Sequence, residues 1–217
     1  MQPNWAEENL QVIRTLMERT GLYRRALAPV MLVAGLVGVT AAAIGEICRW
    51  EGYESFFKLW VVTAVVTASA AAAITRQQAL RSAERFWTQP TARVVGALLP
   101  SFTVGAAIAV IPFALGLSRE LVPNAASMVP LWCCFYGLAL HSAGQVISRG
   151  VRTLGWVFCL VGGLLIYKTS LAPLGFDENG RHTIWLRPNC LMGLSFGGLH
   201  LLAAAYLYFT EKPEVKP

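Results

Sequence analysis

Two histidines lie inside long apolar stretches of the sequence, and their side chains are the ones best suited to chemistry. His200 lies in LMGLSFGGLHLL, and His141 is followed one helical turn later by Gln145. An imidazole can ligate a metal, bind haem iron or transfer a proton. A bis-histidine haem is the sharpest hypothesis, but His141 lies about four residues deeper than His200, roughly 6 Å of helix rise. We therefore expect neutral, hydrogen-bonded histidines, with no metal and no cofactor.

Residues typical of catalysis are scarce in the apolar stretches. No Asp or Glu occurs deep in any of them, and the sequence has no HExxH zinc motif and no paired carboxylates. We therefore expect no catalytic residues and no enzyme activity.

Glycines lie close to both histidines. Gly193 and Gly197 are four residues apart, a spacing that lets two membrane helices approach closely, and Gly198 widens the same surface. Gly137 and Gly144 form a similar small-residue surface around the other histidine. We expect the two histidine-bearing helices to pack against each other through these faces.

Two of the five cysteines lie near the ends of apolar stretches that the topology below places on the same side of the membrane. These residues are Cys48 and Cys190. In an oxidising compartment they could form a disulfide. The sequence contains no CxxC motif, so cysteine spacing indicates no metal or redox site.

The composition requires a membrane environment for these elements. Hydrophobic residues make up 55% of the 217 residues and charged residues only 14%. Runs of about 20 apolar residues are long enough to cross a bilayer, and such runs must be helical because lipid offers the backbone no hydrogen bonds. We predict an all-α membrane protein with a six-span domain at residues 26–209, whose spans are 26–47, 56–75, 94–117, 127–147, 153–172 and 191–209.

The distribution of basic residues predicts the orientation. With the amino terminus in the cytoplasm, twelve of the eighteen Lys and Arg residues fall on the cytoplasmic side, while acidic residues divide evenly. The positive-inside bias then places both termini in the cytoplasm. A basic face beside anionic headgroups accounts for the net charge of +6, and without a basic-aromatic motif we expect no nucleic-acid partner.

Residues 1–25 are expected to form a cytoplasmic amphipathic helix. Asn4 and Glu7 have capping-box spacing, and Leu10, Ile13 and Leu16 fall on one stripe. Such a helix either lies on the membrane surface or docks a cytoplasmic partner. Residues 210–217 are expected to be a short cytoplasmic tail.

Loop lengths suggest an internal repeat of three spans. The long loops precede spans three and six, and they contain FWTQP with Pro90 and IWLRP with Pro188. Two sets of three spans are inverted relative to each other, an arrangement common in transporters. Trp at membrane interfaces and Pro in a first helical turn explain the same match without a repeat.

The chain resembles a family of bacterial six-span integral membrane proteins that has no assigned activity. The resemblance rests on LQVIRTLMERTG before the first span, SRGVRTLGW in an inner loop, and SFGGLH in the last span. Family members carry a Gly-Phe-Gly-Gly-Leu-His run, in which this chain has Ser195 at the first position. Genes of this family often lie beside winged-helix regulators, so the resemblance implies a bacterial inner-membrane location and a regulatory partnership.

Three functions remain open. We expect a noncatalytic sensory, regulatory or scaffold protein that binds a cytoplasmic partner. One alternative is a small-solute permease built on the inverted repeat, and another is a subunit of a larger membrane complex. The expected partners are the lipid bilayer and a cytoplasmic regulator or other membrane subunits.

The predicted topology can be tested with reporter fusions. A reporter active only in the cytoplasm should work at either terminus, and one active only in the periplasm should work at Gly180. The opposite pattern of activities would overturn the six-span orientation.

Overall fold

Six helices of the computed structural model are long and apolar enough to cross a membrane. The structure describes residues 27–81, 87–115, 125–171 and 187–210, and these ranges contain no strand. The helices are the first helix Leu27–Ile47, α2 Tyr53–Arg81, α3 Gln89–Ala114, α4 Ala125–Gly144, α5 Arg149–Leu171 and the last span, which comprises α6 Pro188–Met192, η2 Gly193–Gly198 and α7 Leu199–Thr210. The predicted all-α membrane fold is confirmed. The amphipathic helix expected at residues 1–25 lies outside the described residues.

α2 extends beyond the apolar run from which its span was predicted. The Gly52 carbonyl accepts hydrogen bonds from the Phe56 amide at 2.9 Å and the Ser55 hydroxyl at 3.0 Å, which anchors the start of the helix. At the other end the helix continues through RQQALR to Arg81. Gln, Ala, Leu and Arg are strong helix formers, so the helix continues where its hydrophobicity stops.

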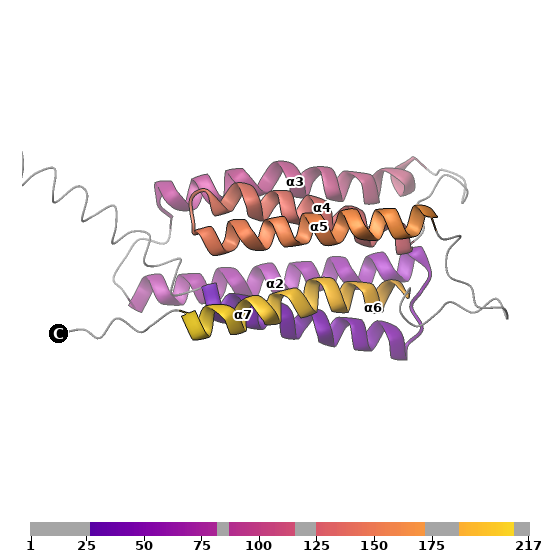
Figure 1. The fold of residues 1–217 in the computed structure, drawn as a ribbon, viewed down its shortest axis with the longest axis horizontal. Coiled ribbons are helices and arrows are strands. Elements are labelled where there is room, and N and C mark those ends of the chain that lie inside the picture. The colour runs from indigo at the N-terminus through magenta and orange to yellow at the C-terminus, as the bar shows by residue number, and fades with distance from the viewer. Residues whose placement is uncertain (1–26, 82–86, 116–124, 172–186, 211–217) are drawn as a thin grey trace, which may run out of the picture.

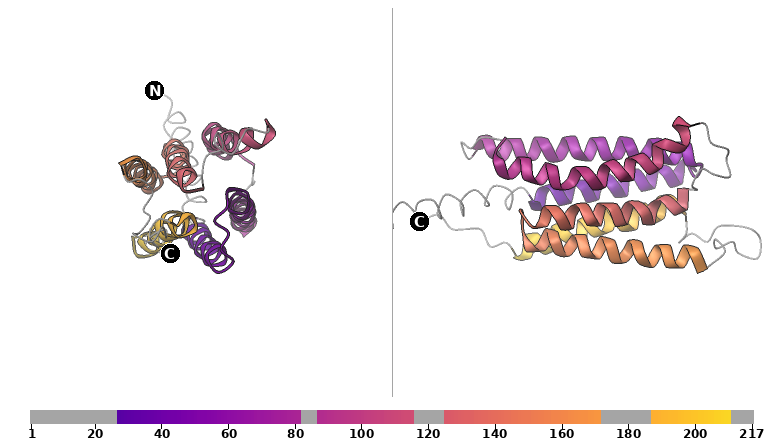
Figure 2. Two further views of the ribbon diagram at one scale, coloured as in Figure 1. Left: turned by 90° about the vertical axis from the view of Figure 1, so that its right-hand side faces the viewer. Right: turned by 90° about the horizontal axis from the view of Figure 1, so that it is seen from above.

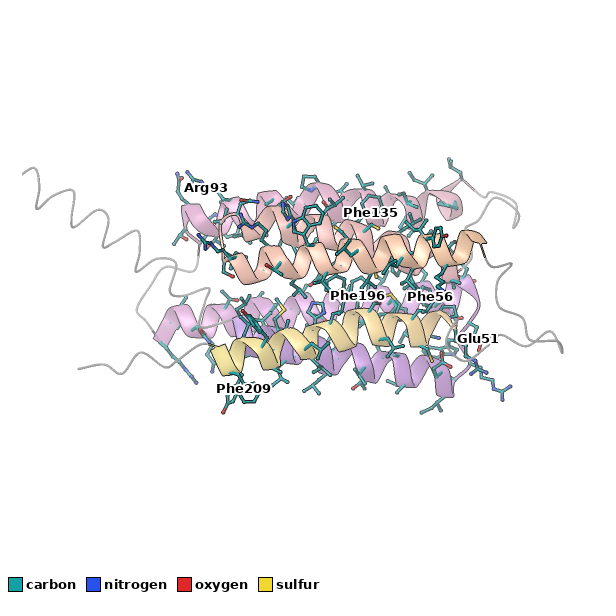
Figure 3. All side chains as sticks on the ribbon, in the orientation of Figure 1. Glu51, Phe56, Arg93, Phe135, Phe196 and Phe209 are labelled. Carbon is teal, nitrogen blue, oxygen red and sulfur yellow. The ribbon has the colours of Figure 1, made fainter. Side chains whose placement is uncertain are left out.

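The helices run side by side in two layers. α3, α4 and α5 form one layer, and the first helix, α2 and the last span form the other (Figure 1). An end-on view shows the same grouping (Figure 2). Two hydrogen bonds hold α3 in place, since the Trp132 indole donates to the Gly105 carbonyl at 3.2 Å and the Tyr53 hydroxyl donates to the Ala109 carbonyl at 2.9 Å. Phe56 and Phe196 lie between the layers (Figure 3).

Charged side chains gather at the two ends of the bundle, which Figure 3 marks by Arg93 at one end and Glu51 at the other. The end we call the arginine end carries Arg76, Arg81, Arg93, Arg149 and Arg152. The opposite end, called the glutamate end, carries Glu46, Glu51 and Glu54, the three acidic residues of the described ranges.

α4 and α5 pack backbone to backbone through glycines. A β-carbon placed on Gly155 would lie 2.5 Å from the His141 amide nitrogen, and one on Gly137 would lie 2.7 Å from the Gly155 carbonyl oxygen. Further along, a β-carbon on Gly162 would lie 2.5 Å from the Cys134 sulfur. No side chain fits at these positions, so the two helices are in the closest contact that glycine permits.

Gly155→Ala should lower the stability of the bundle, because its methyl group would force α4 and α5 apart. Overpacking of this kind costs about 1–3 kcal/mol, which corresponds to a fall of roughly 3–10 °C in Tm for a chain of this size. Thermal unfolding in detergent measures the effect.

Gly163→Ala is the matched control on the same helix, since a β-carbon there would meet nothing within 4 Å. It should leave Tm unchanged or slightly higher, because alanine favours a helix. Equal losses for the two variants would contradict the close α4–α5 contact.

Candidate functional site in the last span

His200 is buried near the start of α7, with 4% of its surface exposed. Its Nδ1 lies within hydrogen-bond distance of the Phe196 carbonyl oxygen, and its Nε2 lies 2.6 Å from the Tyr136 hydroxyl. A carbonyl oxygen can only accept, so Nδ1 must carry the proton. Nε2 of the neutral ring therefore accepts a hydrogen bond from Tyr136, and both ring nitrogens are satisfied within the protein.

Aromatic rings from α3, α4, α5 and η2 surround this pair. Tyr136 meets Phe158 edge to face at 4.9 Å, with Phe196 at 5.2 Å and Phe102 stacked at 6.0 Å between ring centroids. The His200 ring lies 5.4 Å from that of Phe158. These contacts fill the space between the two layers, so the histidine lies in a packed aromatic cluster.

The last span meets the first helix along a line of small residues. A β-carbon on Gly38 would lie 3.1 Å from the Gly197 α-carbon, and one on Gly193 would lie 2.6 Å from the Ala42 β-carbon. The two helices run antiparallel and are in contact along their length, at Gly35–Leu201, Gly38–Gly197, Ala42–Gly193 and Gly45–Asn189. A β-carbon on Gly198, by contrast, would meet nothing closer than 3.9 Å.

A π-helical turn, η2, adapts the last span to this contact. The contacting residues 189, 193, 197 and 201 recur every four residues, whereas an α-helix repeats every 3.6. Over this length an α-helix would turn the contacting face away by roughly a third of a turn. The wider turn of a π-helix absorbs the difference. Inside it, the Ser195 hydroxyl donates to the Leu191 carbonyl at 2.6 Å.

The partners of the glycines differ from the prediction. Gly193 and Gly197 face the first helix, while Gly137 and Gly144 face α5. The expectation that the two histidine-bearing helices pack through glycine faces is therefore wrong. They meet instead through larger side chains, among them Tyr136, which contacts Phe196 and hydrogen-bonds to His200. Small-xxx-small spacing identifies a surface for close approach but does not identify the helix that will use it.

The sequence GLSFG at residues 193–197 matches the G-x-S-x-G pattern of a serine-nucleophile elbow. The expectation of no catalytic residues took no account of this match. The elbow requires a sharp turn between a strand and a helix, and Ser195 lies in a π-helix. Ser195 bonds to the backbone carbonyls of Leu191 and Met192, and His200 bonds to Tyr136 and Phe196. The structure does not pair this serine with the histidine.

His141 and Gln145 lie at a different interface, between α4 and α5. The His141 ring meets Trp156 edge to face at 5.3 Å, and its Nδ1 is buried without a hydrogen bond. Gln145 accepts a hydrogen bond from Arg152 at 3.4 Å. Within the described ranges, no three His, Cys, Asp or Glu side chains come together in a way that could hold a metal ion.

The two cysteines considered for a disulfide are free thiols in this structure. Cys48 is exposed just after the first helix, and Cys190 lies in α6. The Cys190 amide donates instead to a carboxylate oxygen of Glu46 at 3.2 Å.

This carboxylate belongs to a polar network at the glutamate end that the sequence interpretation missed. Arg187 donates to the second oxygen of Glu46 at 3.0 Å and lies 3.6 Å from a carboxylate oxygen of Glu51. The hydrogen bond from Arg187 to Glu46 and the two negative charges hold the pKa of Arg187 above its ordinary value. Glu46 could have indicated this network from the sequence, because it is a carboxylate near the end of the predicted first span.

Asn189 completes this network. Its side-chain oxygen accepts from the Trp60 indole at 3.0 Å, and its side-chain nitrogen donates to the Trp50 carbonyl at 3.0 Å. The Trp50 carbonyl is presented by a turn in which Arg49 adopts a positive φ of 53°. Asn189 thus joins the last span to α2 and to the turn after the first helix.

Comparison with known proteins gives no relative, because no protein-family model, no curated protein and no solved structure matches this chain. The resemblance to a bacterial six-span family stays a prediction. What the site does is inferred from its own geometry and chemistry.

Gly197→Leu should destabilise the protein more than His200→Ala. The leucine would start 2.7 Å from the Val39 side chain and separate the first helix from the last span. Loss of the imidazole removes the hydrogen bonds that it makes with the Tyr136 hydroxyl and the Phe196 carbonyl, which costs roughly 1–3 kcal/mol. Thermal unfolding in detergent ranks the two variants.

Gly198→Leu is the control for side-chain size, because its β-carbon has room, and it should be the mildest of the three. If Gly197→Leu proves as mild as Gly198→Leu, the first helix and the last span do not meet at this position. If His200→Ala leaves Tm unchanged, the Tyr136–His200 hydrogen bond contributes no stability.

Proposed function

We propose that the protein is a noncatalytic integral membrane protein of a bacterial inner membrane that binds a cytoplasmic protein at its arginine end. The observation that carries the proposal is the separation of its polar groups. Charged side chains lie at the two ends of the bundle, and the histidine between the layers already has both ring nitrogens bonded. The side chains open to a soluble partner are therefore those at the ends.

The arginine end is the better candidate for the docking side. Its described residues include five arginines and no acidic side chain, whereas Arg187 at the glutamate end is paired with Glu46 and Glu51. The positive-inside bias assigns the arginine end to the cytoplasm. The amphipathic segment predicted at residues 1–25 connects to the first helix at this same end.

The permease alternative is not proposed. The space between the layers is occupied by Tyr136, Phe158, Phe196 and His200 in mutual contact. A cavity lined by Leu27, Met31, Val151 and neighbouring side chains has a volume of about 20 Å³, room for about one water molecule. A membrane subunit as partner stays an alternative to the cytoplasmic protein.

The proposal is tested by affinity capture of the full-length protein from membranes and quantitative mass spectrometry of what co-purifies. We expect a cytoplasmic protein in near-stoichiometric amount with the wild type. It should be lost from the double variant Leu10→Ser, Ile13→Ser, which interrupts the apolar stripe and leaves every membrane span intact.

The control variant is Glu7→Gln, which changes a charge in the same segment and keeps the stripe. It should retain the partner, and both variants should melt at the wild-type temperature. Undiminished capture by the double variant would contradict docking through this segment. Uptake of a solute by liposomes containing the purified protein would favour the permease.

A further inference from the structure

The connection between α4 and α5 presents polar side chains in a fixed arrangement at the arginine end. α4 ends at Gly144 and α5 begins at Arg149. A β-carbon on Gly144 would lie 2.5 Å from the Arg152 amide nitrogen, so the first turn of α5 is pressed against the last turn of α4. The Arg152 guanidinium donates to Gln145 at 3.4 Å. This corner therefore holds its arginine beside a polar neighbour rather than beside a negative charge.

The basic charge of this corner is not neutralised by the described protein. Arg149 is exposed and Arg152 is partly exposed, and the described ranges place no acidic side chain at this end of the bundle. Two arginines one turn apart can bind the same phosphate group through charge-assisted hydrogen bonds. The corner is thus complementary to an anion at the membrane surface.

His141 adds a second polar group, about four residues or roughly 6 Å deeper into the membrane than Gln145. Its Nδ1 is buried without a partner, and no hydrogen bond joins its ring to the described part of the chain. A neutral imidazole carries one N–H. Because Nδ1 faces no acceptor, the proton belongs on Nε2, which is not enclosed. The Nε2–H group therefore finds no acceptor among the described residues.

Trp156 shows that this surface faces lipid at the depth of the membrane interface. Its indole lies against His141 with ring centroids 5.3 Å apart, and 57% of its surface is exposed. Tryptophan is enriched where the headgroups meet the acyl chains. At this depth a lipid is the available source of an acceptor for His141.

We propose that this corner binds one anionic phospholipid. Arg149 and Arg152 bind the phosphodiester, with Gln145 holding Arg152 in position. One turn deeper, His141 donates from Nε2 to an ester carbonyl of the same lipid, and Trp156 packs beside the start of an acyl chain. The order of protein groups, from basic to neutral donor to apolar, matches the order of groups along a phospholipid. The proposal does not depend on the cytoplasmic partner proposed above.

The test is a lipid titration of the full-length protein in detergent, followed by native mass spectrometry. Phosphatidylglycerol should bind with a stoichiometry of one at low concentration, ahead of phosphatidylcholine. Arg149→Gln with Arg152→Gln should weaken this first binding event roughly 10- to 30-fold, as expected for two interfacial arginines. His141→Phe, which keeps a ring of similar shape, should weaken it about threefold.

The matched control is Arg76→Gln with Arg81→Gln, which removes two exposed arginines from the same end of the bundle on α2. It should bind phosphatidylglycerol like the wild type. Equal losses in both double variants would overturn the proposal in favour of diffuse surface charge, and equal binding of the two lipids would overturn it as well.

Two further measurements separate binding from its alternatives. Inorganic phosphate in millimolar amounts should not raise Tm, and a rise that depends on Arg149 and Arg152 would assign the site to a soluble phosphate instead. The lipid-free variants should melt at the wild-type temperature. If the Arg149→Gln, Arg152→Gln variant unfolds, the proposal is tested by His141→Phe alone. Lipid binding by His141→Phe equal to that of the wild type would overturn the proposal.

Discussion

The close antiparallel contact between the first helix and the last span is the constraint on which the rest of the bundle depends. Lipid is as apolar as the side chains it contacts, so hydrophobicity does not drive helices together inside a membrane. The backbones approach each other at Gly38–Gly197, and the Asn189 side chain packs against Gly45, so the contact instead gains dispersion interactions that only small residues permit. The polar network of Glu46, Arg187 and Asn189 then fixes the register of this contact at one end of the bundle.

The aromatic cluster follows from that register. The π-helical turn keeps Gly193, Gly197 and Leu201 against the first helix, and His200 then lies on the other side of the span, facing α4. Its bond to Tyr136 joins the two layers of the bundle. π-Helical turns are uncommon and often lie at functional sites, but here the packing of the span accounts for the turn. His200 therefore contributes to helix assembly in the structure described.

The sequence predicts the fold class and the approximate spans, because hydrophobic run length and backbone hydrogen bonding are set by the membrane itself. It identifies Gly193 and Gly197 as a surface for close approach but not its partner. The contacting residues of the first helix are Gly35, Gly38, Ala42 and Gly45, and only Gly38 and Ala42 have the four-residue spacing that marks such a surface. The π-helix has no sequence signature, and Asn189 acquires its role only when Trp50 and Trp60 are brought to it by folding.

The pairing of the first helix with the last span has a consequence for synthesis of the protein. Glu46 and Arg187 are separated by 141 residues, so the first helix emerges from the ribosome long before its partner exists. Until then its glycine surface meets only lipid, and the Glu46 carboxylate lacks its guanidinium. A chain interrupted before residue 187 would keep five spans and lose the element that closes the bundle. Closure of the bundle therefore waits until the last span has been synthesised.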